Sequence, residues 1–169
     1  NDIITEFRGR GDEIRVYPLS YSEYKEAIGS QSDHLDEYMM YGGMPAIVKM
    51  DDPEMKMGYL TRLFDEIYLK DIMERHSIGK KMELEMITDV LCSSIGSLTN
   101  PSKICDTMAS NRMSIDYNTV SDYIGFLEDS FLIHRVKRYD VKGRRYISTP
   151  CKFYLADTGL RNTRLNFRQ

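Results

Sequence analysis

The sequence predicts a mainly helical α+β fold. Two observations point to helices: one long apolar pattern with helical spacing follows Asp52, and three shorter helical patterns lie close together between Met82 and Leu127. A third observation adds a small antiparallel sheet, because the segment from Phe131 to Tyr139 is rich in β-branched and aromatic residues. With 169 residues, of which 41% are apolar, the chain is long enough to bury a core.

The first third of the chain contains short elements. Residues 14–17 alternate in polarity and predict a short strand that ends at Pro18. Ser20 or Ser22 can cap a helix near residues 23–28. A second short helix is expected over residues 35–41, and Gly42 and Gly43 are expected to end this helix.

The clearest helix start is Asp52-Pro53, an N-cap residue followed by proline at the first helical position. Apolar residues then recur with a 3.6-residue period up to His76, and Gly79 breaks the pattern. Such a stripe predicts a core-facing helix rather than a cofactor site. Its members are Met55, Tyr59, Leu60, Leu63, Phe64, Ile67, Tyr68 and Ile72.

The following segment predicts three helices and then a sheet. The first helix covers about residues 82–97, Asn100-Pro101 opens the second, and Asp116 caps the third. Strands are expected over residues 131–139, 145–148 and 152–156, with a turn at Gly143. This order is typical of a winged helix-turn-helix, here preceded by a helical linker or lid. The residues expected to face inward are Met86, Ile87, Val90, Leu91, Ile95, Ile104, Cys105, Met108, Ala109, Val120, Tyr123, Ile124 and Leu127.

The charge of the chain is uneven, although the net charge is only −3. Residues 130–169 have 10 basic and 2 acidic side chains, a local net charge of +8. Basic side chains on a hairpin can reach DNA phosphates, and Asn118 and Thr119 on the third helix can contact bases. The residues predicted to contact double-stranded DNA are Asn118, Thr119, Arg135, Lys137, Arg138, Lys142, Arg144 and Arg145. The alternative is a solvated hairpin whose charges protect an edge strand from aggregation.

The third helix itself argues against DNA. Its acidic residues Asp122, Glu128 and Asp129, together with the cap residue Asp116, would repel a phosphate backbone. We therefore keep a second hypothesis, in which the winged helix is a protein-interaction or oligomerisation module that binds no nucleic acid.

The sequence contains few features of an enzyme, a metal-binding protein or a membrane protein. The paired carboxylates have no lysine or histidine partner, and no phosphate-binding GxxxxGK[ST] loop occurs, so we expect a chain that is not itself an enzyme. Arg10, between two glycines, is a weak candidate for an arginine finger. The three cysteines and three histidines lack the spacing of a disulfide framework or metal site. Without a leader or a long apolar run, a cytoplasmic protein without membrane contact is expected.

Several segments together resemble one family. The Gly9-Arg10 and Pro18-Leu19-Ser20 pattern is similar to the stretch that closes the ATPase core in prokaryotic AAA-type ATPases with the C-terminal domain of unknown function 4143. The further matching segments are residues 38–45, 68–75, 118–129 and 152–162.

The resemblance implies a fragment of a larger protein. Residues 1–30 would be the tail of the AAA ATPase core, residues 31–80 a helical linker or lid, and residues 81–165 the winged-helix domain. The Walker motifs would lie upstream, so ATP and Mg²⁺ would bind the parent and this fragment would hold no cofactor. Nucleotide state would then control the binding of a partner. The expected partners are double-stranded DNA, the parent's own ATPase core and a second copy of the chain.

Overall fold

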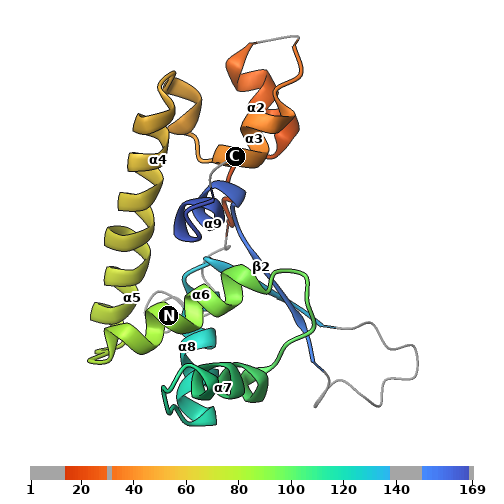
Figure 1. Cartoon of the computed structure of the whole chain (residues 1–169). Coiled ribbons are helices and arrows are strands. Elements are labelled where there is room, and N and C mark those ends of the chain that lie inside the picture. Colours follow the sequence, from red (N-terminus) through yellow and green to blue (C-terminus); the bar gives the residue numbers. More distant parts are fainter. Residues whose placement is uncertain (1–13, 30–31, 138–149, 168–169) are drawn as a thin grey trace.

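The computed structural model describes residues 14–29, 32–137 and 150–167. The described chain is mainly helical with one small antiparallel sheet, so the predicted α+β class is confirmed. Figure 1 shows an elongated arrangement with α2 and α3 at one end and α7 and α8 at the other. The elements are α2 (Tyr21–Ile28), α3 (Leu35–Tyr41), the 3₁₀ turn η1 (Ile47–Lys49), α4 (Pro53–Arg62), the π-helical η2 (Leu63–Leu69), α5 (Lys70–Arg75), α6 (Lys81–Ser93), α7 (Pro101–Ser110), α8 (Tyr117–Asp129), β1 (Ile133–Val136), β2 (Lys152–Leu155) and α9 (Thr158–Arg164).

Four helices begin at the cap residues that the sequence indicates. The side chains of Ser20, Asp52, Asn100 and Asp116 each accept a hydrogen bond from the backbone N–H three residues further along. Each cap satisfies a donor that the helix leaves unpaired, which stabilises the helix by about 1 kcal/mol.

The long helix predicted after Asp52 runs without a break through α4, η2 and α5, but its middle is wound as a π-helix. A π-helix aligns residues five apart. Phe64 and Leu69, which are five apart, are accordingly both buried. The simple 3.6-residue period predicted for this helix therefore fails between these two residues.

One hydrophobic core joins the long helix to α6, α7, α8 and the sheet. The four predicted inward residues of α8 (Val120, Tyr123, Ile124 and Leu127) are all buried. In α6 the buried face is turned relative to the prediction, because Leu84, Thr88 and Cys92 join Ile87 and Leu91 in the core. Met86 and Val90 are only half-buried. In α7, the predicted core residue Ala109 is exposed.

The sheet pairs β1 with β2 in antiparallel register, so that His134 lies opposite Tyr154. Thr99, between α6 and α7, adds a single bridge to Cys151 through two backbone hydrogen bonds of 2.9 and 3.0 Å. The predicted strand at residues 14–17 is wrong: this segment is extended but pairs with no strand among the described residues. Tyr17 instead packs its ring 5.7 Å from that of His134.

The sequence did not predict helix α9. This helix packs against α3, which lies near the start of the described chain. Its cap residue Asp157 is buried and accepts hydrogen bonds from the backbone N–H of Gly43 and of Leu160. The amide of Asn162 donates to the carbonyls of Met39 and Met40 at the end of α3. The α3–α9 junction therefore satisfies buried polar groups on both helices.

Arg164, at the end of α9, connects two further helices. Its guanidinium donates to both carboxylate oxygens of Asp89 on α6 and lies 3.6 Å from the carboxylate of Asp65 on η2. The same guanidinium lies over the ring of Phe64. These contacts fix α9 against the long helix and α6 together.

Candidate functional site

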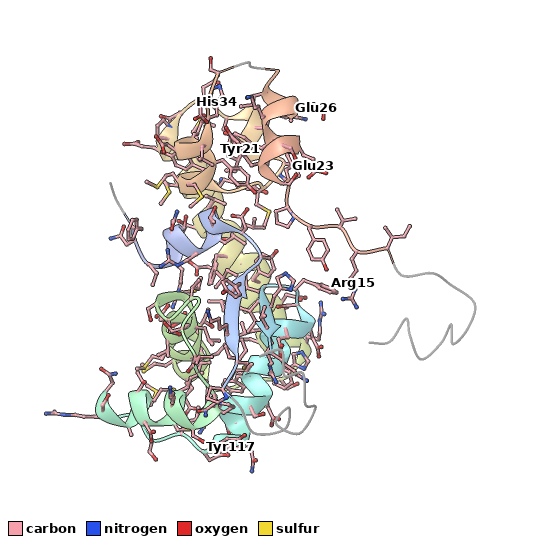
Figure 2. All side chains as sticks on the ribbon, turned by 90° about the vertical axis from the view of Figure 1, so that its right-hand side faces the viewer. Arg15, Tyr21, Glu23, Glu26, His34 and Tyr117 are labelled. Carbon is pink, nitrogen blue, oxygen red and sulfur yellow. The ribbon has the colours of Figure 1, made fainter. Side chains whose placement is uncertain are left out.

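The first candidate surface is the exposed N-terminal part of α8. Tyr117 is 53% exposed, and Asn118 and Asp122 are exposed as well. Figure 2 shows Tyr117 at one extremity of the molecule, far from Tyr21 and His34 at the other. Among the described residues, the N-terminal part of α8 is therefore exposed at one end of the molecule.

The charge of this surface is set by Asp116. Its carboxylate accepts hydrogen bonds from the backbone N–H groups of Asn118 and Thr119 and from the hydroxyl of Thr119. These bonds, with the Thr119 hydroxyl first, hold the pKa of Asp116 below its usual range, so the group is ionised at neutral pH. The Thr119 hydroxyl, which was predicted to contact a base, is thus engaged within the helix cap.

Two of the basic residues that were predicted to contact DNA lie on or beside β1. Arg135 forms an ion pair with Glu128 of α8 and lies over the ring of Phe153. Lys137 is exposed at the end of the strand. The other basic residues of this prediction lie outside the described residues; they are Arg138, Lys142, Arg144 and Arg145. The arginine-finger candidate Arg10 also lies outside them.

The second candidate surface is an open groove with a volume of about 830 Å³ at the opposite end of the molecule. α3, α4 and the end of α9 form its walls. Sequence reasoning did not find it, because its three walls come from distant parts of the chain. The groove is lined by Asp36, Glu37, Met40, Tyr41, Asp51, Pro53, Glu54, Lys56, Met57, Gly58, Thr61, Thr163, Asn166 and Phe167.

A buried lysine lies in the wall of this groove. Lys56 is only 4% exposed, and its ammonium forms an ion pair with Glu37 and lies 5.1 Å from the centre of the Tyr41 ring. The ion pair holds the pKa of Glu37 below its usual range, mainly through the hydrogen bond from Lys56. One signal in the sequence could have found it: Lys56 lies four residues before Leu60 and eight before Phe64, on the buried stripe of the long helix.

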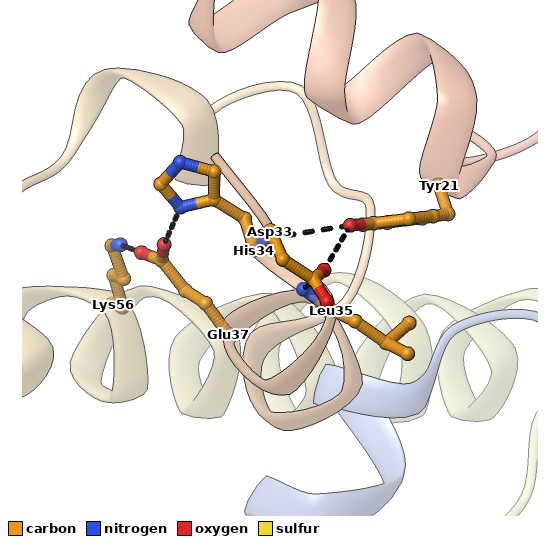
Figure 3. A network of polar contacts seen from close by, with 6 residues as sticks. All are labelled: Tyr21, Asp33, His34, Leu35, Glu37 and Lys56. Carbon is orange, nitrogen blue, oxygen red and sulfur yellow. Dashed lines mark hydrogen bonds and ion pairs between the residues drawn. The ribbon is translucent and has the colours of Figure 1, made fainter. Parts of the chain in front are cut away.

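A chain of polar contacts ties this lysine to α2, as Figure 3 shows. Glu37 also lies 3.3 Å from the ring Nδ1 of His34, whose backbone N–H donates to the hydroxyl of Tyr21. That hydroxyl donates to Asp33 at 2.6 Å. The network fixes α2, α3 and α4 relative to one another, so the wall of the groove is built before any partner binds.

Neither surface gathers metal-binding side chains among the described residues. Over residues 14–29, 32–137 and 150–167 the histidine, cysteine and acidic side chains form no group that could hold a metal ion. In the same part of the chain, no helix is long and apolar enough to cross a membrane. The three cysteines are free thiols, and burial raises the pKa of Cys92 to about 12.

Comparison with known proteins gives two related chains. An uncharacterised protein of Haemophilus influenzae is 38% identical over 166 residues, which cover 95% of this chain and 41% of that protein. The uncharacterised protein MJ1544 of Methanocaldococcus jannaschii is 25% identical over 179 residues, which cover 98% of this chain and 40% of that protein. The chain thus spans about two fifths of the length of these relatives, and neither name is that of an enzyme. No solved structure matches the chain.

The comparisons overturn the resemblance to AAA-type ATPases with the domain of unknown function 4143. The family model that matches is a different one, and nothing in the comparisons supports ATP binding or DNA binding. The structure offers a physical reason for part of the misleading pattern. Gly43 and Gly159 are required where backbones meet, since a side chain on Gly43 would overlap the Leu19 carbonyl and one on Gly159 the Tyr41 carbonyl.

The matching model describes a domain of unknown function, DUF8612, and covers residues 32–169. This range includes the α3–α9 junction, the groove and α8, and excludes α2. The chain therefore belongs to the DUF8612 family.

Proposed function

We propose that this chain is a protein-interaction module with a winged-helix arrangement, and that α8 is its partner-binding helix. The order of elements supports the arrangement: α6, the bridge residue Thr99, α7, α8, β1 and β2 follow one another, and Thr99 pairs with Cys151 at the outer edge of β2. In a winged helix the second helix of the helix-turn-helix is the one presented to a partner, and here that helix is α8.

The absence of positive charge on α8 is the observation that favours a protein partner. The helix has no lysine or arginine, and Asp122, Glu128 and Asp129 make it acidic. Residues 101–129, which contain both α7 and α8, have 2 basic and 5 acidic side chains, a net charge of −3. DNA phosphates would be repelled by such a surface, because phosphate affinity depends on neutralising cations.

The exposed N-terminal residues of α8 supply what a protein interface uses. Tyr117 offers a large ring with a polar end, which is a frequent anchor in interfaces. Asn118 and the ionised Asp116 can accept or donate hydrogen bonds around it. On β1, which follows α8, Arg135 is already paired with Glu128.

The proposal can be tested by cross-linking. Tyr117 is replaced by the photoreactive benzoylphenylalanine in the cells that make the protein, and the exposed Ala109 of α7 is replaced in a matched control. We expect a discrete protein adduct from position 117 that is absent from position 109. Identical adduct patterns from both positions would contradict a specific role for α8.

A second measurement separates this proposal from DNA binding. Fluorescence anisotropy with a random-sequence duplex, at about 50 and about 200 mM salt, covers the range in which phosphate contacts become visible. We expect no binding in the micromolar range at either salt concentration. Micromolar binding that weakens steeply with salt and is lost when Lys142, Arg144 and Arg145 are changed together to Ala would overturn the protein-partner proposal.

A further inference from the structure

The groove between α3, α4 and α9 has an apolar part, here called its floor, that the other described residues leave open. Met40 and Met57 line it together with Tyr41, and Phe167 is 50% exposed at its edge. Methionine side chains are flexible and polarizable, so they adapt to apolar side chains of different shapes. A floor of this kind suits an aliphatic or aromatic side chain presented by another protein.

The rim of the same groove is acidic. Asp36, Asp51 and Glu54 line it, and none of the three has a basic partner within the described part of the chain. The basic side chain in the wall, Lys56, does not offset them, because it is buried and paired with Glu37. The free charge of the rim is therefore negative, and its carboxylates face solvent.

We propose that this groove binds a basic amphipathic helix of a partner protein. The apolar face of such a helix, with anchors at positions i, i+3 or i+4 and i+7, would lie on the methionine floor. Lysine or arginine side chains beside those anchors would reach the rim carboxylates at Asp51 and Glu54. An acidic helix of equal hydrophobicity would be rejected by like charges, so the rim selects the partner by charge.

This inference goes beyond the role proposed for α8, because it uses the other end of the molecule and different residues. Nucleic acid does not suit the groove, since its phosphates would face three carboxylates that have no basic partner among the described residues. The polar network from Lys56 to Tyr21 supports the proposal, because it holds α3 and α4 in place and lowers the cost of ordering the groove upon binding.

Synthetic peptides test the proposal directly. The first is an amidated peptide of about 18 residues, five helical turns, made of leucine and lysine with leucine on one helical face. The second replaces every lysine with glutamate, and the third has the composition of the first in an order that spreads leucine around the helix. At about 150 mM salt, we expect micromolar binding of the first peptide by calorimetry and at least about tenfold weaker binding of the other two.

A charge reversal locates the binding site. The double variant Asp51→Lys with Glu54→Lys should bind the first peptide about tenfold more weakly, because each exposed charge pair that is lost contributes a few-fold. The matched control, Glu66→Lys with Asp106→Lys, makes the same change in net charge at exposed positions of η2 and α7. We expect its affinity to stay within about twofold of the unmodified chain.

NMR spectra of labelled methionine methyl groups report contact with the apolar floor, which a change in charge alone would not produce. Met40 and Met57 should shift on adding the first peptide, whereas Met82, exposed on α6 at 66%, should not. Equal binding of the first and third peptides, equal loss in the two double variants, or a shift of Met82 without Met40 and Met57 would each overturn the proposal.

Discussion

Replacing Gly159 with alanine should destabilise the fold strongly, because the backbone of another segment already occupies the space for the added methyl group. The added Cβ would overlap the carbonyl oxygen of Tyr41 and would lie 3.0 Å from the backbone nitrogen of Gly42. Both obstacles are backbone atoms, so no side-chain rotation can make room. The α3–α9 junction would have to open.

The cost can be worked out from the contacts that the junction contains. Overpacking a well-packed site costs about 1 to 3 kcal/mol. Opening the junction would also weaken the two hydrogen bonds from Asn162 and the bond from Gly43 to Asp157, each worth about 1 kcal/mol. We therefore expect the free energy of unfolding to fall by about 3 to 5 kcal/mol, within the range in which single changes are diagnostic.

Urea unfolding followed by circular dichroism measures this loss. Gly125→Ala is the matched control, because Gly125 is also helical and a Cβ there meets nothing within 4 Å. Since alanine is the better helix former, the control should be more stable than the original chain by about 0.5 to 1 kcal/mol. A loss of less than about 1 kcal/mol for Gly159→Ala would refute the reasoning about the junction.

Further experiments test the other contacts. Arg164→Ala should cost about 2 to 4 kcal/mol, because it removes a half-buried clamp on three elements, whereas Arg75→Ala breaks only an exposed pair and should cost less than about 0.5 kcal/mol in the same urea assay. Glu37→Ala leaves the ammonium of Lys56 buried and unpaired and should cost about 3 to 5 kcal/mol, whereas Lys56→Met should be nearly neutral at pH 7. The pKa of Glu37 is lower in the folded than in the unfolded chain. The ion pair therefore contributes its full stabilisation of the fold above the unfolded pKa, and this contribution is lost as pH falls through the folded pKa. In Lys56→Met, the free energy of unfolding should not show this loss at acid pH. Since burial raises the pKa of Cys92 to about 12, iodoacetamide at pH 8 should leave this thiol unmodified until urea unfolds the chain, and mass spectrometry that finds it alkylated at once would contradict its burial.

The parts of the fold that the sequence predicts are those with local signals. The caps at Asp52 and Asp116 depend on residues only three positions apart, and a helix start needs nothing else. The buried face of α8 was also predictable, since its four core residues repeat at one helical spacing and lie against neighbours close in the sequence. For such elements, propensity and packing agree.

The elements that sequence reasoning missed depend on distant contacts. α9 is short and contains Gly159, so it has little helical signal of its own, and it is held by α3 more than a hundred residues earlier. Lysine is usually a surface residue, and the burial of Lys56 depends on its pairing with Glu37. The groove follows from both, because its walls exist only once α9 has packed against α3 and α4.

The two proposed interaction surfaces are linked by rigid elements. The long helix from Pro53 to Arg75 begins at the groove. Just beyond its other end, the ring of His76 stacks on the ring of Phe126 in α8, with 3.7 Å between the ring centroids. Arg164 braces the middle of this path by bonding to both the long helix and α6. Partners bound at the groove and at α8 would therefore be held at a fixed separation and orientation. That arrangement suits the two proposed roles, because a module that joins two partners needs both surfaces on one rigid frame.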